Sequence, residues 1–109
     1  MTEKALLHLI NSGESENLAF KSTFNKEVIE TLVSFANISG AYVLIGVSSS
    51  AKIIGVDLND ESVQNWINEI KSKTNFTIVP EVFIIESNNQ KVVALKIDEY
   101  PIKPVSVQG

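Results

Sequence analysis

The amino-acid sequence predicts an α+β domain in which a mixed β-sheet packs against amphipathic helices. Three observations support this prediction. Apolar residues repeat every three or four positions in three segments, as on the buried face of a helix, and they alternate or run together in shorter segments, as in strands. Most changes of pattern fall at Gly, Pro, Asn or Ser, which are typical of turns. The predicted order is α-β-α-β-β-α-β-β.

The N-terminal third is predicted to form a helix over residues 2–11, a strand over 17–22 and a longer helix over 26–38. The longer helix has the clearest signal, because its apolar residues recur at helical spacing. These residues are Val28, Ile29, Leu32, Val33 and Ala36. Asn25 precedes this helix as a predicted N-cap, and Glu27 in the first turn complements the helix dipole.

Residues 41–47 are the clearest predicted strand, because the run AYVLIGV carries no charge. A strand that is apolar throughout is typical of a sheet covered on both faces. The small residues Ser48–Ala51 are predicted to turn the chain. Residues 52–56 are then predicted to return as an antiparallel strand.

The C-terminal half is predicted to contain one more helix and a hairpin. The helix starts at Asn59-Asp60, and its apolar spacing predicts that Trp66 belongs to the core rather than to a platform for stacking bases. Two strands follow at residues 82–85 and 92–97. The polar segment 87–90 between them is predicted to be the hairpin turn.

Length and composition indicate one globular domain. With 109 residues, 44% of them hydrophobic and 20% charged, the chain is of ordinary domain size. We expect the domain to span residues 1–104, with 105–109 as the start of a linker or a truncated continuation. The chain has no cysteine, which excludes disulfides, thiolate metal sites and a cysteine nucleophile. No segment reads as a signal peptide or as the roughly 20 apolar residues of a membrane span, so we expect a cytoplasmic protein without membrane contact.

The charge balance limits which partners the chain can bind strongly. The net charge is −4, and nine lysines carry all the positive side-chain charge because the chain has no arginine. Strong non-specific binding to phosphate backbones depends on clustered basic residues. Any binding of DNA or RNA by this chain is therefore expected to be weak or confined to one lysine-lined face.

Three motifs together resemble a known family. They are ESENLAFKS at residues 14–22, SFANISGAYVLIGVS at 34–48 and KIIGV at 52–56. In this order they resemble the Schlafen/AlbA-like DNA-binding domain, and the resemblance extends to about residue 104. It implies a strand–helix–strand fold, a nucleic-acid partner, and a bacterial regulator-like or RecG-helicase-like protein that continues beyond Gly109.

Two departures from the family pattern bear on catalysis. In relatives that cut RNA, the resemblance implies three carboxylates that together hold a divalent metal, because one carboxylate alone binds such ions poorly. Glu14 matches the first position, but Ala19 and Ser48 occupy the other two. We therefore predict no catalytic residue, no metal and no enzymatic activity. Glu16 is an alternative second acid, although it and Glu14 are better interpreted as solvated loop charges.

The candidate nucleic-acid contacts come from the same motifs. They are Lys21, Asn37, Gly40, Ser48, Ser49, Ser50 and Lys52. Lys21 matches the family lysine, and it either contacts phosphate or simply faces solvent. Asn37 is expected mainly to cap the helix end, and Gly40 to adopt positive φ at its C-cap. We call Ser48–Ala51 the serine turn. No cofactor is predicted, because the serine turn lacks the G-x-x-x-x-G-K-[ST] spacing of a phosphate-binding loop.

The leading hypothesis is a non-catalytic module that binds DNA or RNA within a bacterial transcriptional regulator-like protein. An alternative is a protein-interaction or oligomerisation domain, a homodimer for example, that pairs chains through the sheet edges at residues 53–56 or 92–97. A third hypothesis is a divalent-metal-dependent RNase that uses Glu14 and a further acid.

Overall fold

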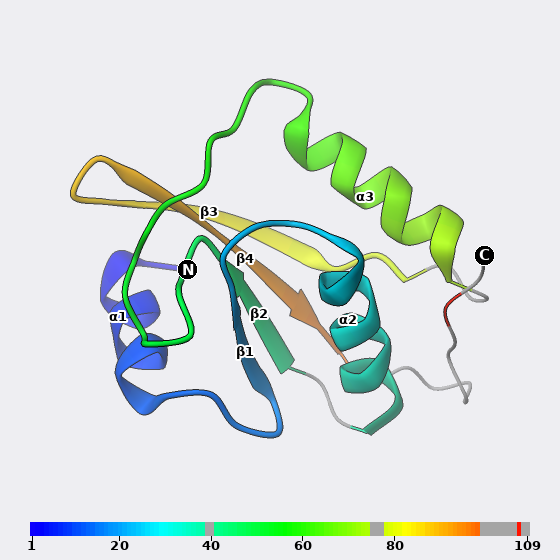
Figure 1. Cartoon of the computed structure of the whole chain (residues 1–109), viewed down its shortest axis with the longest axis horizontal. Helices are drawn as coiled ribbons and strands as arrows, with labels where there is room; N and C mark the ends of the chain where they lie inside the picture. The colour runs from blue at the N-terminus through cyan, green and yellow to red at the C-terminus, as the bar shows by residue number, and fades with distance from the viewer. Residues whose placement is uncertain (39–40, 75–77, 99–106, 108–109) are drawn as a thin grey trace.

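The computed structural model describes residues 1–38, 41–74, 78–98 and 107. In this part of the chain, three helices cover a four-stranded mixed sheet, which confirms the predicted α+β class (Figure 1). The elements are α1 (Glu3–Ser12), β1 (Leu18–Lys21), α2 (Lys26–Ile38), β2 (Ala41–Ile45), α3 (Ser62–Lys73), β3 (Glu81–Ser87) and β4 (Gln90–Ile97). None of the described helices is long and apolar enough to cross a bilayer.

The strands lie in the order β1-β2-β4-β3. β1 runs parallel to β2, with Lys21 level with Ile45, while β4 is antiparallel to both β2 and β3. The uncharged strand β2 therefore has a neighbour on each side. Its residues Val43, Leu44 and Ile45 have no exposed surface, which confirms the prediction of a strand covered on both faces.

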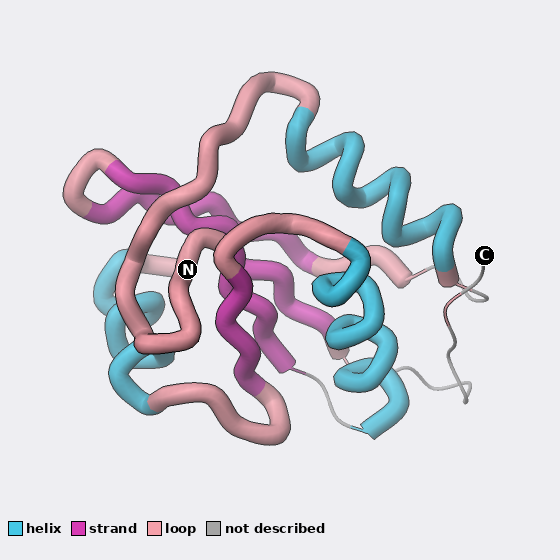
Figure 2. The backbone as a smooth tube through the Cα atoms, in the orientation of Figure 1, coloured by secondary structure: helices cyan, strands magenta, loops and turns pink. Residues whose placement is uncertain are grey.

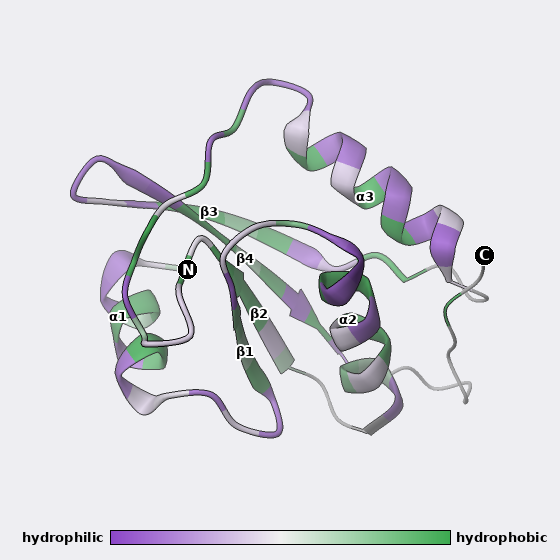
Figure 3. Cartoon of the chain, viewed as in Figure 1, coloured by the Kyte–Doolittle hydropathy of each residue, from purple (hydrophilic) through white to green (hydrophobic). Residues whose placement is uncertain are grey.

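Successive strand residues point alternately into two apolar clusters, because side chains alternate across a sheet. Val43 and Ile45 belong to the larger cluster, together with Leu32 and other residues of α2 and with part of α3. Leu44 belongs to the second cluster, with Leu6 of α1. We call these the α2-face cluster and the α1-face cluster. Figure 3 shows hydrophobic colouring on the strands and on the helix faces turned toward them.

The helix ends follow local capping rules. The backbone N–H of Glu27 donates to Asn25 Oδ1 at 3.0 Å, which confirms Asn25 as the N-cap of α2. At the start of α1, the N–H of Ala5 donates to Thr2 Oγ1 at 3.1 Å. α1 ends at Gly13, whose φ of 80° is a conformation that glycine adopts readily.

The prediction of a strand over residues 52–56 is wrong. The segment between β2 and α3 is an extended loop (Figure 2), and only an isolated bridge joins Val47 to Ile53. Two causes are visible. Both sides of β2 are already occupied by β1 and β4, so no position next to it remains for another strand. In addition, positive φ at Gly46 and Gly55 turns the chain out of the extended conformation.

The predicted hairpin is confirmed, and it is longer than expected. Its turn residues Asn88 and Asn89 have φ values of 51° and 65°. Positive φ at both central residues defines a type I′ turn, which matches the twist of paired strands. The expectation that residues 92–97 form an exposed edge is wrong, because β4 lies between β2 and β3.

One residue near the C-terminus is tied to the domain. Val107 forms an antiparallel bridge with Thr74 and packs against the α2-face cluster. The predicted domain end at residue 104 lies outside the described residues.

Candidate nucleic-acid interface

Parallel pairing brings the carboxyl ends of β1 and β2 together. Lys21 is the last residue of β1, and the backbone N–H groups of Gly46 and Val47 donate to its carbonyl oxygen at 2.8 and 3.2 Å. The chain that leaves β2 is thus fastened to Lys21 before it enters the serine turn. We call this end of the sheet, where β1 and β2 finish and β4 begins, the Lys21 end.

The serine turn has a defined conformation. The N–H of Ser48 donates to the Lys52 carbonyl at 2.8 Å, and the N–H of Ala51 donates to the Ser48 carbonyl at 3.0 Å. The Ser48 hydroxyl accepts from the Lys52 N–H at 3.2 Å and lies 2.9 Å from Ser50 Oγ. The Ser48 hydroxyl therefore braces the turn, while the side chains of Ser49, Ser50 and Lys52 face solvent.

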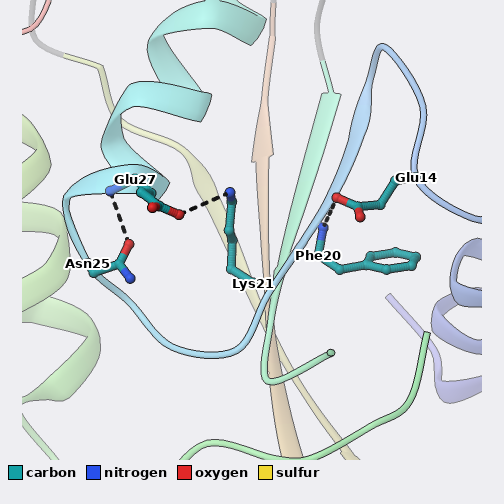
Figure 4. Close-up of polar contacts among 5 residues, drawn as sticks. All are labelled: Glu14, Phe20, Lys21, Asn25 and Glu27. Carbon is teal, nitrogen blue, oxygen red and sulfur yellow. Dashed lines mark hydrogen bonds and ion pairs between the residues drawn. The ribbon is translucent and has the colours of Figure 1, made fainter. Parts of the chain in front are cut away.

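Lys21 does not simply face solvent, because it forms an ion pair within the domain. Its side chain is 24% exposed, and its ammonium Nζ lies 3.8 Å from Glu27 Oε2 (Figure 4). Glu27 is 71% exposed, and such solvent-screened pairs typically contribute about 0–1 kcal/mol. A phosphate could therefore displace this carboxylate at little cost.

Gly46 allows the following loop to cross tightly over the start of β4. Its φ is 101°, and a Cβ at this position would lie 3.1 Å from the Lys91 carbonyl oxygen and 3.2 Å from the Gly55 carbonyl carbon. The Gly46 carbonyl accepts from the N–H groups of Ile54 and Gly55, at 2.8 and 2.9 Å. Gly46 therefore permits a close approach of the loop backbone to β4.

The same crossing adds a cation that sequence reasoning missed. The N–H of Val56 donates to the Lys91 carbonyl at 2.9 Å, and the Lys91 side chain is exposed. Lys91 also lines a pocket of about 410 Å³ with Asp57 and Gln90. No local motif marks Lys91, because its place depends on the antiparallel pairing of β4 with β2, in which Val93 lies opposite Ile45.

The predicted contact residues do not form one group. Lys21, Ser48–Ser50 and Lys52 lie at the Lys21 end. Asn37 lies in the last turn of α2, just before β2 begins, and hence at the opposite end of β2. Gly40 and its predicted positive φ lie outside the described residues.

Glu14 has a specific backbone partner. Its Oε2 accepts a hydrogen bond from the N–H of Phe20 at 3.1 Å (Figure 4). Ser15 and Leu18 exchange backbone hydrogen bonds at 3.0 and 3.4 Å, so the segment before β1 folds back along the outer edge of that strand. Glu14 is therefore more than a solvated loop charge, while the neighbouring Glu16 is exposed.

The side chains at the three family acid positions do not fit a divalent metal. Glu14 is hydrogen-bonded to the backbone, Ala19 is buried in the α2-face cluster, and Ser48 supplies only a hydroxyl that already braces a turn. Among the described residues, no group of three or more His, Asp or Glu side chains is placed to hold a metal ion.

Trp66 lies where its helical spacing predicted. It packs against the α2-face cluster, and its ring stacks on Phe24 with centroids 5.0 Å apart and planes 8° apart. One face of the indole is therefore occupied from within the domain, which agrees with a core role rather than a base-stacking role.

A family comparison agrees with this architecture. The model of the family described as Schlafen, AlbA_2 matches residues 14–109. The chain belongs to the Schlafen AlbA_2 family. This AlbA_2 chain is 30% identical to an uncharacterized ATP-binding protein of Ureaplasma parvum serovar 3, over 91% of the chain. It spans about a third of that relative, 34% of its length.

Solved structures share the fold of this AlbA_2 chain. The N-terminal domain of a RecG-related protein from Nitrosomonas europaea superposes with a TM-score of 0.75 at 19% identity, covering 100% of this chain and 82% of that one. The DIP2311 protein from Corynebacterium diphtheriae gives a TM-score of 0.71 at 14% identity, covering 92% and 22%. At these identities the likeness establishes the fold alone.

The Lys21 end of this AlbA_2 domain offers a modest site for an anion. Lys52 and Lys91 are exposed there, and Lys21 is held only by a weak ion pair. The carboxylates of Glu27 and Asp57 lie among them. The electrostatic potential at this surface therefore has contributions of both signs and is not strongly positive. Such a surface can bind phosphate oxygens singly through ammonium groups, without the bidentate grip of arginine.

Proposed function

We propose that this AlbA_2 domain is a non-catalytic nucleic-acid-binding module of a bacterial transcriptional regulator-like protein. The proposed contact surface is the Lys21 end of the sheet. The observation that carries the proposal is the hydrogen bonding of Gly46 and Val47 to the Lys21 carbonyl, which fastens the serine turn and Lys52 beside Lys21. Family membership and the RecG-related structural neighbour support a nucleic-acid partner.

The charge of the domain predicts the strength of this binding. Phosphate binding by lysine releases counterions, and log K falls with log salt by about 0.9 for each neutralised phosphate on duplex DNA. With three lysines at the Lys21 end, we expect a slope of about −2 to −3. The net charge of −4 opposes approach of the polyanion. Affinity should therefore be low for the isolated chain and measurable only at low salt.

The non-catalytic part of the proposal rests on the family acid positions. The Glu14 carboxylate is used by the β1 edge, and Ala19 and Ser48 supply no carboxylate. A divalent-metal RNase is the competing function. Incubating RNA with the chain in Mg²⁺ or Mn²⁺ tests it directly: cleavage that Glu14→Ala abolishes would overturn the non-catalytic assignment.

Binding can be tested by fluorescence anisotropy with labelled single- and double-stranded oligonucleotides at low salt. Lys52→Ala should weaken binding about fivefold, corresponding to about 1 kcal/mol for one phosphate contact. Lys71→Ala is the matched control, because Lys71 is an exposed lysine in the last turn of α3. Figure 1 shows this end of α3 well away from the end of β1. The affinity of this control should stay within about twofold of the unmodified chain. Absence of binding at high micromolar protein, or equal losses in both variants, would refute the proposed surface.

A further inference from the structure

The two outer strands of the sheet, β1 and β3, differ in whether the backbone groups of their outer edges are hydrogen-bonded within the domain. At β1, the N–H of Phe20 is satisfied by Glu14, and Leu18 exchanges backbone hydrogen bonds with Ser15. This folded-back segment occupies the outer edge of β1. Proteins commonly cover or charge an edge strand in this way, since its unpaired backbone groups can otherwise recruit another strand.

The outer edge of β3 has no comparable cover among the described residues. Ser87 and Gln90 flank a two-residue turn and so form a hydrogen-bonded pair. Alternation along the ladder then directs the backbone groups of Val82, Ile84 and Glu86 away from β4. No hydrogen bond to these outward groups is present in the described part of the chain.

β3 has few of the features that usually discourage pairing, and its two charged residues, Glu81 and Glu86, lie toward its ends. It is seven residues long, its register with β4 is continuous, and it contains neither proline nor lysine. Ile84, at its centre, is 55% exposed, so α3 leaves this side chain open. A long, regular edge with an exposed apolar residue at its middle is a template for an added strand.

We propose that β3 of a second copy of this chain pairs antiparallel with β3, with the two-fold axis at Ile84. In this register Ile84 lies opposite Ile84 of the partner subunit, and Val82 and Glu86 exchange backbone hydrogen bonds with the same residues in reversed order. On the other face of the sheet, Phe83 lies opposite Ile85, a favourable pair of aromatic and β-branched side chains. The two sheets become one continuous sheet.

Charge and backbone chemistry favour a two-fold axis at Ile84 over one at Val82 or Glu86, the other two residues whose backbone groups point away from β4. Centring on Val82 would bring Pro80, which has no N–H, into the ladder opposite Ile84. Centring on Glu86 would set two carboxylates directly against each other. Centring on Ile84 places no two carboxylates directly opposite. The proposal goes beyond nucleic-acid binding and does not depend on it.

Single-cysteine variants test the register, because the chain has no cysteine of its own. Across the axis, the Cα atoms of Ile84→Cys would lie about 5.5 Å apart, within the range that a disulfide spans. Glu86→Cys is the matched control on the same strand and face. Its two copies would be offset by four residues, roughly 13 Å along the strands. We expect oxidation to cross-link Ile84→Cys nearly completely and Glu86→Cys hardly at all.

Sedimentation equilibrium tests the assembly itself. The unmodified chain should sediment as a dimer at high micromolar concentration. Ile84→Lys, which sets two ammonium groups at the axis, should raise the dissociation constant at least tenfold. Leu7→Lys is the control, because Leu7 is an apolar residue of α1 with 41% exposure, and it should sediment as the unmodified chain does. Circular dichroism verifies that each variant is folded. The proposal would be overturned if the unmodified chain is monomeric or if the dimer survives Ile84→Lys. Equal cross-linking of the two cysteine variants would overturn it as well.

Discussion

Removing the Glu14 side chain should destabilise the domain without touching its core. In Glu14→Ala the Phe20 N–H loses a carboxylate acceptor at 3.1 Å. Hydrogen bonds to charged groups are worth about 1.5–3 kcal/mol when water cannot replace them. This bond is only part-buried, so water recovers some of the loss and we expect about 1 kcal/mol. For a domain of this size, that loss lowers the melting temperature by about 5 °C.

Two further variants separate the hydrogen bond from the charge. Glu14→Gln keeps an amide oxygen that can accept from the Phe20 N–H, so its unfolding free energy should stay within about 0.5 kcal/mol of the original. Glu16→Ala removes an exposed acid two residues away and should change stability by less than about 0.5 kcal/mol. Urea denaturation followed by circular dichroism measures all three. If Glu14→Ala and Glu16→Ala have equal unfolding free energies, the proposed edge-covering role of Glu14 is wrong.

Two other predictions concern the elements around the Lys21 end. Gly46→Ala should lower the unfolding free energy by about 2–4 kcal/mol, because positive φ combines with a backbone contact at 3.1 Å to the Lys91 carbonyl. Gly13→Ala, where positive φ meets no atom within 4 Å, should lose about 1 kcal/mol; equal losses in denaturant titrations would contradict the close approach. Phe24→Leu should lose about 1 kcal/mol by removing the ring stacked on Trp66. Emission from Trp66, the one tryptophan of the chain, should shift to the red, and an unchanged spectrum would contradict this packing.

Periodicity predicted the elements whose signals are local. The helix expected over residues 26–38 is α2 with the same bounds, because a sustained apolar repeat and the Asn25 cap both act within a few residues. The asparagine-containing turn similarly predicted the hairpin of β3 and β4. Its positive φ values at Asn88 and Asn89 are conformations that asparagine tolerates better than most residues.

The segment 52–56 shows where local pattern reasoning fails. IIGV has the composition of a strand, yet strand formation also requires a neighbouring strand with free hydrogen-bonding groups. β2 is occupied on both sides by β1 and β4. β4 lies far along the chain, so a local pattern contains no sign of this competition. The prediction that residues 92–97 form a sheet edge is wrong for the same reason, since strand order, and not strand composition, decides which strand lies at an edge.

The candidate site divides in the same way. The residue identities alone, with Ala19 and Ser48 at acid positions and no arginine in the chain, determined which donors are available for metal or phosphate. The donor groups of a side chain are set by its residue type and do not depend on the fold. Tertiary structure decided which of those donors meet. It brought Lys21 beside the serine turn, added Lys91 and left Asn37 at the other end of β2. The reason is physical: these neighbours are joined by hydrogen bonds between strands distant in the chain.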